Sequence, residues 1–383
     1  MPGTSGVKAL FFSYFAFVGI TSPYLSLYFA DRGFTVAEIG VLMTVPQVLR
    51  IIGPPFWGWL ADRMSRRGTL LRASAGAVLA LTLLLPLASG AGYFATLALV
   101  GVLYFMTSAQ APLAEAMALE SAGGDFGRYG RMRLWGSVGF IVAVSAIGWA
   151  LDRAGVATLA WWMAAMAVGL LAASWRLGTA SAAQVHSGVV GTIRLRLRER
   201  RIQLFFLANF LMIVAHMGLY VFYSLYLSGL GYSKTAIGLL WALAVLAEIA
   251  LFRLQRPLFE RFGAAFLLSA SIGVAALRFA LIGLSGGWLP VLIVAQLMHA
   301  VTFGLHHSAV MARLHEWFEP SRQARAQALY VTVAYGCGGT LGGLMVSALW
   351  IGLSPSAAFL GCSFAALLGC AAAMASARQT VSS

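Results

Sequence analysis

The chain has 383 residues, of which 60% are hydrophobic and only 10% are charged, and its formal net charge is +14 at pH 7. Soluble domains carry roughly 25% charged residues. This composition, with a mean hydropathy of +0.85, excludes a soluble enzyme or binding domain and indicates a protein embedded in a membrane.

Apolar runs long enough to span a bilayer recur along the whole chain. A helix crosses the hydrocarbon core, roughly 30 Å thick, with about 20 apolar residues. The runs are about twice as long as barrel strands and lack a period of two, so they predict helices. We therefore predict an all-α membrane protein with twelve transmembrane helices, near residues 7–30, 37–61, 69–90, 93–119, 131–151, 156–176, 202–228, 235–255, 264–285, 288–314, 326–350 and 355–376. The first run is too long for a signal peptide and shows no cleavage site, so we expect it to remain as a span.

The distribution of positive charge predicts the orientation of the chain. If the N-terminus lies in the cytoplasm, most of the 26 Lys and Arg residues fall in cytoplasmic segments, as the positive-inside rule requires. We therefore expect both termini in the cytoplasm and read the basic excess as orientation, with no nucleic-acid partner.

Arg50 is the first charged residue that the apolar pattern does not explain. It stands inside the second predicted span, where one arginine costs about 2.5–3.5 kcal/mol. It lies about 20 Å along that helix at 1.5 Å per residue, too deep for the side chain to reach either surface. Residues at such depth usually line a water-filled substrate path, so Arg50 is a candidate substrate-binding residue. The alternative is a fixed Arg–acid bridge between helices.

The loop after the second span reads "GWLADRMSRRGTL". Its pattern of Gly58, Asp62, Arg63, Arg66 and Arg67 resembles the signature of the major facilitator superfamily between helices 2 and 3, except that Ser65 replaces a usual glycine. The resemblance implies that this motif, Asp62 and Arg63 above all, helps to gate the transporter. A plain positive-inside loop would explain the arginines alone.

The segment "APLAEAMALESAGGDFGRYGRMRLWGSVGF", residues 111–140, carries a closer resemblance. It is similar to the fourth and fifth helices of the phenylpropionate permease group and, more distantly, of lactose permease and the oligosaccharide–proton symporters. Pro112, Glu115 and Arg133 have the spacing found in those proteins. The resemblance implies that Glu115 and Arg133 contact substrate, and the alternative is a pair that only seals the cavity.

An internal repeat divides the chain into two bundles. Residues 26–42 align without a gap on residues 224–240, with seven identities, and the same register places Arg50 on Glu248. We predict an N-terminal six-helix bundle at 1–176, a cytoplasmic linker at 177–201 and a C-terminal six-helix bundle at 202–383. Parallel repeats of this kind are typical of the pseudo-symmetric major facilitator fold, with substrate bound between the halves.

Three ionisable residues mark the second half. Glu248, Arg278 and His299 match positions that belong to the proton-coupling network of the sugar symporters, and the resemblance implies that role here. Thr302 stands where the sugar carriers have a second acid, which favours the phenylpropionate group over sugars. The alternatives are a fixed Glu248–Arg278 bridge and a His299 that is merely a hydrogen-bonded core residue.

No enzyme motif occurs in the chain. We find no HExxH, GxSxG, P-loop or catalytic carboxylate pair, so we expect no catalytic residues, no metal site and no cofactor other than the coupling proton. The three cysteines have no metal or redox spacing, and we expect all of them to be small core residues: Cys337, Cys362 and Cys370.

A count of the predicted cavity charges suggests the substrate. Three cations (Arg50, Arg133 and Arg278) face two acids (Glu115 and Glu248), and an anionic substrate would complete the set. We predict a monomeric, proton-coupled symporter of the bacterial inner membrane that imports a small organic acid, such as the aromatic carboxylate 3-phenylpropionate, by alternating access. The alternatives are a sugar or nucleoside proton symporter and, from a different class, a membrane sensor without transport.

Overall fold

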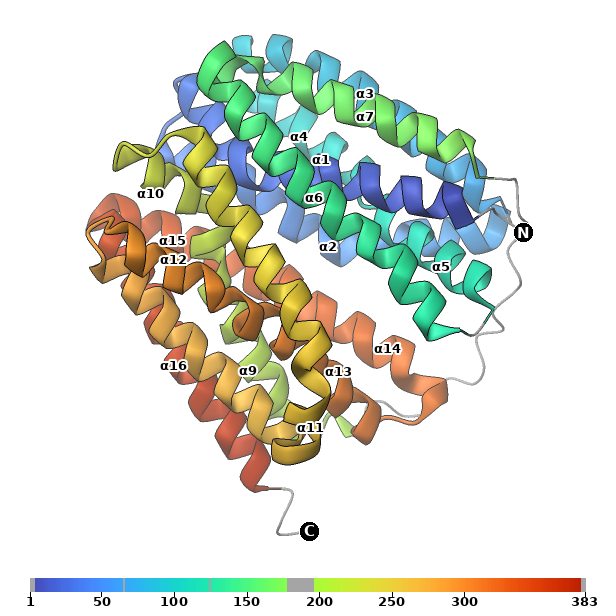
Figure 1. Ribbon diagram of the computed structural model, residues 1–383, viewed down its shortest axis with the longest axis vertical. Helices are drawn as coiled ribbons and strands as arrows, with labels where there is room; N and C mark the ends of the chain where they lie inside the picture. Colours follow the sequence, from blue (N-terminus) through green and yellow to red (C-terminus); the bar gives the residue numbers. More distant parts are fainter. Residues whose placement is uncertain (1–3, 65, 124, 178–195, 380–383) are drawn as a thin grey trace. The chain divides into compact units, whose positions relative to one another are not determined.

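The computed structural model describes residues 4–64, 66–123, 125–177 and 196–379 (Figure 1). Within these ranges the chain forms helices and no β-strand. Eleven helices are long and apolar enough to cross a membrane. The predicted all-α membrane class is therefore confirmed. Most of the predicted linker, residues 178–195, lies outside the described ranges, as does Ser65 of the loop motif.

The number of spans depends on how the longest helical element is counted. Helix α11 (Lys234–Leu284) has 51 residues and contains Gly263 with φ 72° and ψ 160°, a non-helical conformation that joins two helices across a kink. Glycine tolerates this positive φ because it has no Cβ. The predicted total of twelve counts these two arms separately, at 235–255 and 264–285, and it stays a prediction.

The chain divides into two compact units. Unit 1 holds the described residues of Met1–Val185 together with Ser224–Ala242, and unit 2 holds those of His186–Tyr223 together with Leu243–Ser383. A segment from the second half of the sequence thus packs within unit 1. The predicted bundle boundaries at 176 and 202 stay predictions.

Unit 1 is built around the first helix. Helix α1 (Thr4–Asp31) packs against α6 and α7 (Figure 1), and α3 packs against α4 and α7. Its core is apolar, with Leu10, Phe11, Leu71 and Leu170 fully buried. The other helices of this unit are α2 (Val36–Met64), α3 (Arg67–Gly90), α4 (Tyr93–Thr107), α5 (Gln110–Ala122), α6 (Phe126–Ala154), the 3-10 turn η1 (Val156–Thr158) and α7 (Leu159–Trp175).

Unit 2 is built around α9 (Arg200–Met217), which packs against α15 and α16. Three of its segments are π-helical: η2 (Gly218–Phe222), η3 (Ala300–Leu305) and η4 (Val331–Gly338). Such wider turns often occur at functional sites. The remaining helices are α10 (Tyr223–Gly229), which lies almost wholly in unit 1, and α12 (Leu289–Leu297), α13 (His306–Trp317), α14 (Pro320–Tyr330), α15 (Gly339–Gly352) and α16 (Pro355–Arg378).

The cysteine prediction is wrong at one position. Cys362 is buried and Cys370 is intermediate, but Cys337 is exposed. Cys337 lies in the π-helical segment η4, where the wider turn breaks the periodicity used to assign faces.

The sequence repeat corresponds to a repeated backbone turn. Gly33 has φ 81° and Gly231, its repeat partner, has φ 86°. After α1, the Phe34 N–H donates to Phe29 O at 3.1 Å. After α10, the Tyr232 N–H donates to Leu227 O at 3.0 Å. Both turns therefore end their helix with the same Schellman motif, and both need glycine at its centre.

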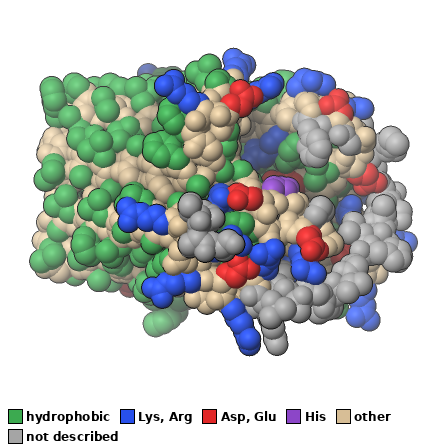
Figure 2. Space-filling view, turned by 90° about the horizontal axis from the view of Figure 1, so that it is seen from below, with side chains coloured by type: hydrophobic (Ala, Val, Ile, Leu, Met, Phe, Trp, Pro, Cys, Tyr) green, Lys and Arg blue, Asp and Glu red, His purple; other side chains and the backbone are tan. Residues whose placement is uncertain are grey.

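The surface is divided by residue type. On the face shown in Figure 2, hydrophobic side chains cover the left part, and charged side chains gather toward the right. An apolar band beside a charged end is the surface expected of a chain that sits across a bilayer.

Candidate functional site

The first group of site residues lies in unit 1. Arg50 is exposed on α2. The Tyr14 hydroxyl lies within electrostatic range of Arg50, Glu115 and Arg133 together. Tyr104, on α4, is near Arg50 and Tyr14 as well. The three predicted substrate residues thus lie in the same region of unit 1.

Glu115 and Arg133 form an ion pair. The Arg133 Nε lies 3.8 Å from Glu115 Oε1, and the two side chains are 35% and 45% exposed, respectively. The Arg133 guanidinium also lies over the Phe15 ring, 4.2 Å from its centroid, and 5.5 Å from that of Phe11. The pair therefore stands in the open against an aromatic wall, where a ligand can reach it.

A short turn between α5 and α6 positions this pair. Gly123 ends α5 with φ 60°, and the Asp125 carboxylate then accepts from the Arg128 backbone N–H at 2.9 Å. This hydrogen bond holds the pKa of Asp125 below its usual value. Asp125 is thus a helix cap that fixes the start of α6, two turns before Arg133.

The second group lies in unit 2 and centres on Arg278. This side chain is fully buried. Its Nε donates to Ala295 O at 2.7 Å, and its Nη2 donates to Gln296 Oε1 at 3.1 Å. Its Nη1 reaches both Thr302 Oγ1 and His299 Nδ1 at 3.1 Å. These neutral partners, all supplied by α12 and the turn after it, hold the guanidinium in one place.

The hydrogen bond from Arg278 fixes the tautomer of His299. A guanidinium has donors and no acceptor, so His299 Nδ1 must accept. The proton of the neutral ring therefore sits on Nε2, which lies 4.0 Å from Glu248 Oε2. The ring also stacks on Phe303 with an interplanar angle of 8°. The structure thus brings Glu248, His299 and Arg278 together in one group, and their proton-coupling role stays a prediction.

Glu248 packs closely against the facing helix. Its side chain is 17% exposed. A Cβ added at Gly304, in the π-helical segment η3, would lie 2.9 Å from Glu248 Cγ. A larger residue at position 304 would therefore require the Glu248 side chain to shift.

The loop motif has a different set of contacts. Arg67 Nη1 lies 3.6 Å from Glu120 Oε2, which links α3 to α5. Arg63 lies over the Trp59 ring at 5.6 Å, and Arg66 is exposed. Asp62 is exposed, with no hydrogen bond or ion pair to any described residue. A Cβ at Gly58 would meet nothing within 4 Å. The gating role of the motif stays a prediction.

Sequence reasoning missed several of these residues. Nothing in the local sequence marks Tyr14, because its position near three ionisable groups depends on packing. Gln296 alone does not indicate a functional site. It lies three residues before His299, however, and Thr302 lies three residues after His299. Polar residues at helical spacing around a histidine in an apolar helix were a usable signal for a hydrogen-bond network. Among the described residues, no group of three or more metal-ligating side chains could hold an ion.

Comparison with known proteins gives the family. The model of the MFS_1 like family matches residues 5–361. The chain is 34% identical over 336 residues to the "Probable 3-phenylpropionic acid transporter" of Escherichia coli (strain K12), covering 85% of this chain and 86% of the relative. It is 30% identical over 270 residues to the "Maltose permease" of Geobacillus stearothermophilus, covering 70% and 68%.

Solved structures agree on the fold. A crystal structure of a mutant of the nucleoside transporter NupG has a TM-score of 0.85 at 18% identity and covers 97% of this chain and 99% of that one. A POT family transporter in complex with 5-aminolevulinic acid has a TM-score of 0.73 at 12% identity and covers 96% and 94%. The chain therefore belongs to the MFS_1 like family, and it is a multi-pass membrane transporter of the major facilitator type.

Proposed function

We propose that this transporter is a proton-coupled symporter that imports a small organic acid, an aromatic carboxylate such as 3-phenylpropionate. The observation that carries the proposal is the connected group of Arg278, His299 and Glu248, which offers one carboxylate, partly reachable, beside a fixed N–H donor. Likeness to the 3-phenylpropionic acid transporter supports this substrate class.

Arg50 binds the substrate carboxylate in this proposal. Its guanidinium can form a bidentate, charge-assisted pair with a carboxylate. The nearby Tyr14 hydroxyl can donate to the same group, and Phe11 and Phe15 offer ring surfaces to an aromatic substrate. Glu115 and Arg133 complete the binding site as a polar wall.

Glu248 exchanges the coupling proton. His299 is a poor proton carrier in the arrangement described, because Arg278 occupies its Nδ1 and its Nε2 already bears a hydrogen. Its Nε2 lies 4.0 Å from Glu248 Oε2, so Glu248 is the group of this cluster that can take up and release a proton. Protonation of Glu248 neutralises the acid of this group and changes which conformation is favoured, while Arg278 and His299 keep their places. Glu115 is the second choice for the proton carrier.

Alternating access is proposed to move residues 1–176 against residues 202–376, with the linker at 177–201. The proposed setting is a monomer in the bacterial inner membrane, with both termini in the cytoplasm. The distribution of Arg and Lys supports this orientation. No cofactor takes part beyond the coupling proton.

A sugar or nucleoside symporter is the second candidate. Likeness to maltose permease favours it. Thr302 argues against direct transfer of the sugar mechanism, since a hydroxyl that accepts from Arg278 cannot replace an acid in proton exchange. A sensor that binds without transport is the candidate from another class.

Uptake of labelled 3-phenylpropionate into proteoliposomes tests the proposal. With an inward proton gradient, we expect accumulation above equilibrium, and an uncoupler should abolish it. Maltose and uridine serve as competing substrates under the same conditions. Accumulation of one of these and not of the acid would favour the second candidate, and binding without any accumulation would favour the sensor.

A further inference from the structure

One segment packs apart from the half of the sequence to which it belongs. We call Ser224–Ala242 the strap. It follows the linker and belongs to the second copy of the repeat, yet it lies in unit 1, and α11 continues from it at Leu243 into unit 2. We propose that a clasp formed by Asp152, Tyr24, Gly148 and Gly238 holds the strap on α1 and α6, and that the transporter opens on this side when the clasp releases.

Asp152 supplies the polar part of the clasp. Its carboxylate, on α6, accepts from the Lys234 N–H at 2.8 Å, the Thr235 N–H at 2.8 Å and the Thr235 hydroxyl at 2.5 Å. These are two of the first N–H groups of α11, which have no partner inside the helix. An acid at this position also faces the positive end of the helix dipole.

The first copy of the repeat shows what is unusual in the second. At the matching turn, α2 begins with a local capping box: Glu38 accepts from the Thr35 N–H at 2.8 Å, and the Glu38 N–H donates to Thr35 Oγ1 at 3.3 Å. In the second copy Ser233 still accepts from the Ala236 N–H at 3.1 Å. Ala236, however, stands where the first copy has the acid Glu38. The Asp152 carboxylate, on α6, accepts from the free N–H groups instead. The cap has thus changed from a local contact to one that joins two distant segments.

Tyr24 and two glycines supply the packed part of the clasp. The buried Tyr24 hydroxyl lies 2.7 Å from Val144 O on α6 and 3.2 Å from Lys234 O on the strap. A Cβ at Gly148 would lie 2.5 Å from Lys234 O, and a Cβ at Gly238 would lie 2.5 Å from Val144 O. The backbones of α6 and α11 therefore approach as closely as glycine allows.

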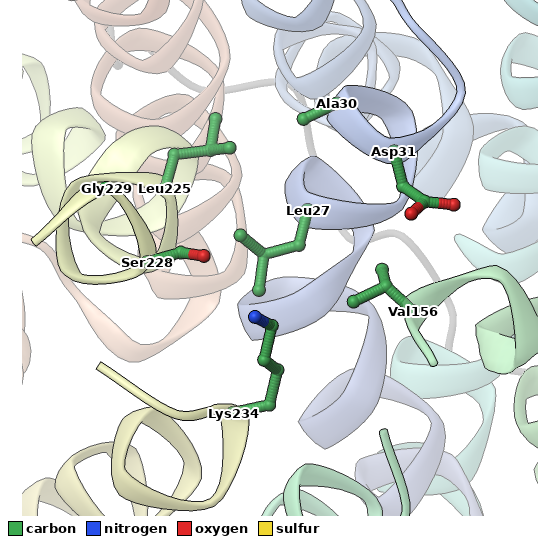
Figure 3. Close-up of a pocket in the computed structure, with 8 residues that line it drawn as sticks. All are labelled: Leu27, Ala30, Asp31, Val156, Leu225, Ser228, Gly229 and Lys234. Atoms are coloured by element: carbon green, nitrogen blue, oxygen red, sulfur yellow. The ribbon is translucent and has the colours of Figure 1, made fainter. Parts of the chain in front are cut away.

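A pocket of about 360 Å³ lies beside the clasp (Figure 3). Leu27, Ala30, Asp31 and Val156 line one side, and the strap contributes Leu225, Ser228, Gly229 and Lys234. In Figure 3 the Ser228 and Lys234 side chains point toward Leu27. Movement of the strap away from α1 would enlarge this pocket and expose Ser228, which is now half-buried.

This inference rests on the proposed alternating access between two conformations. It names the contacts that must break when the transporter changes from one conformation to the other. If the second half moves as a body, the strap must leave unit 1. The Asp152 hydrogen bonds and the glycine contacts then break together, since all of them join α6 or α1 to the same turn of α11. The clasp thereby sets how often the open state is visited.

The test measures exposure of the strap and needs no substrate. A Ser228→Cys reporter is placed in a Cys337→Ser background, which removes the exposed native thiol, and reacts with a membrane-impermeant maleimide in proteoliposomes. Asp152→Ala should raise the labelling rate about fivefold, the shift expected when a helix cap is lost. Thr235→Val, which removes one donor and keeps the volume, should raise it less. Gly238→Ala, which forces the backbones apart, should raise it as well.

Glu38→Ala is the matched control, because it removes the equivalent cap in the first copy and should leave the labelling rate of Ser228→Cys unchanged. Equal labelling in the parent, Asp152→Ala and Thr235→Val, all monodisperse by gel filtration, would overturn the proposal. Because labelling is independent of uptake, a clasp that opens on mutation stands even if 3-phenylpropionate is not transported. If the labelling rates do not change, the clasp proposal is wrong, and the uptake test of the proposed function is unaffected.

Discussion

The two copies of the repeat place one ionisable residue each in their second helix, and the surroundings of these residues differ. Arg50 is exposed, and the nearby Glu115–Arg133 pair is 45% and 35% exposed at 3.8 Å. Glu248 is 17% exposed, and the nearby Arg278 is fully buried, with hydrogen bonds to the neutral groups of Ala295, Gln296, His299 and Thr302. The two copies therefore differ: the first exposes charged side chains that a ligand can reach, and the second holds Arg278 in one fixed position.

Removal of the Arg278 guanidinium should have the largest effect on the stability of the fold. Arg278→Met leaves buried acceptors on Ala295, Gln296 and Thr302 without their donor, so we expect the free energy of unfolding to fall by about 2–4 kcal/mol. Thermal denaturation in detergent measures this. Arg133→Met is the matched control, and its half-exposed arginine should cost less than about 1 kcal/mol. Equal losses in both variants would show that the two arginines do not differ as described.

Glu248→Gln should abolish accumulation of substrate above equilibrium and retain exchange of substrate across the membrane. Glutamine keeps the shape of the side chain beside His299, but it cannot take up a proton. We expect substrate to equilibrate without exceeding its outside concentration, while counterflow of labelled substrate continues. Glu260→Gln, which changes an exposed acid of α11 outside the proposed site, is the control and should keep uphill accumulation. Uphill accumulation by Glu248→Gln would move the coupling role to another residue.

Arg50→Gln should weaken substrate binding. The loss of a charge-assisted hydrogen bond, worth about 1.5–3 kcal/mol, should raise the half-saturation concentration of an acidic substrate by about 10- to 100-fold. Arg50→Lys should have a smaller effect, since lysine keeps the charge and loses the planar fork. Arg153→Gln, which removes an exposed arginine elsewhere in unit 1, serves as control. An unchanged half-saturation concentration in Arg50→Gln would remove Arg50 from the binding site.

The smallest expected effect is the coupling energy between Glu115 and Arg133. A half-exposed pair at 3.8 Å is screened by water, so a double-mutant cycle with Glu115→Gln and Arg133→Gln should give a coupling energy of about 0.2–1 kcal/mol. Thermal denaturation of the four proteins supplies the cycle. A coupling well above this range would mean that the pair stabilises the fold, and the contrast with Arg278 would be lost.

Much of the architecture was predictable because it follows from hydropathy. The helical class can be read from local sequence. The register of the repeat can be read in the same way, and Gly33 and Gly231, which it pairs, form the same turn. The grouping of Glu115 with Arg133, and of Glu248 with Arg278 and His299, was predicted through resemblance.

Other features depend on packing and could not be predicted in this way. The π-helical segments η3 and η4 have wider turns, so residues within them, such as Cys337, face directions that a period of 3.6 misassigns. The tautomer of His299 depends on which nitrogen Arg278 reaches. The strap has the apolar pattern of any helix end, and hydropathy carries no information on which unit it packs against.

Gly304 shows how such a transporter could be retuned in evolution. A methyl group added here would lie 2.9 Å from Glu248 Cγ, so the Glu248 side chain would have to shift beside His299. A residue with neither a charge nor a titratable proton can therefore alter the position of the acid that is proposed to carry the coupling proton. A survey of relatives that compares ionisable positions alone would pass over that change.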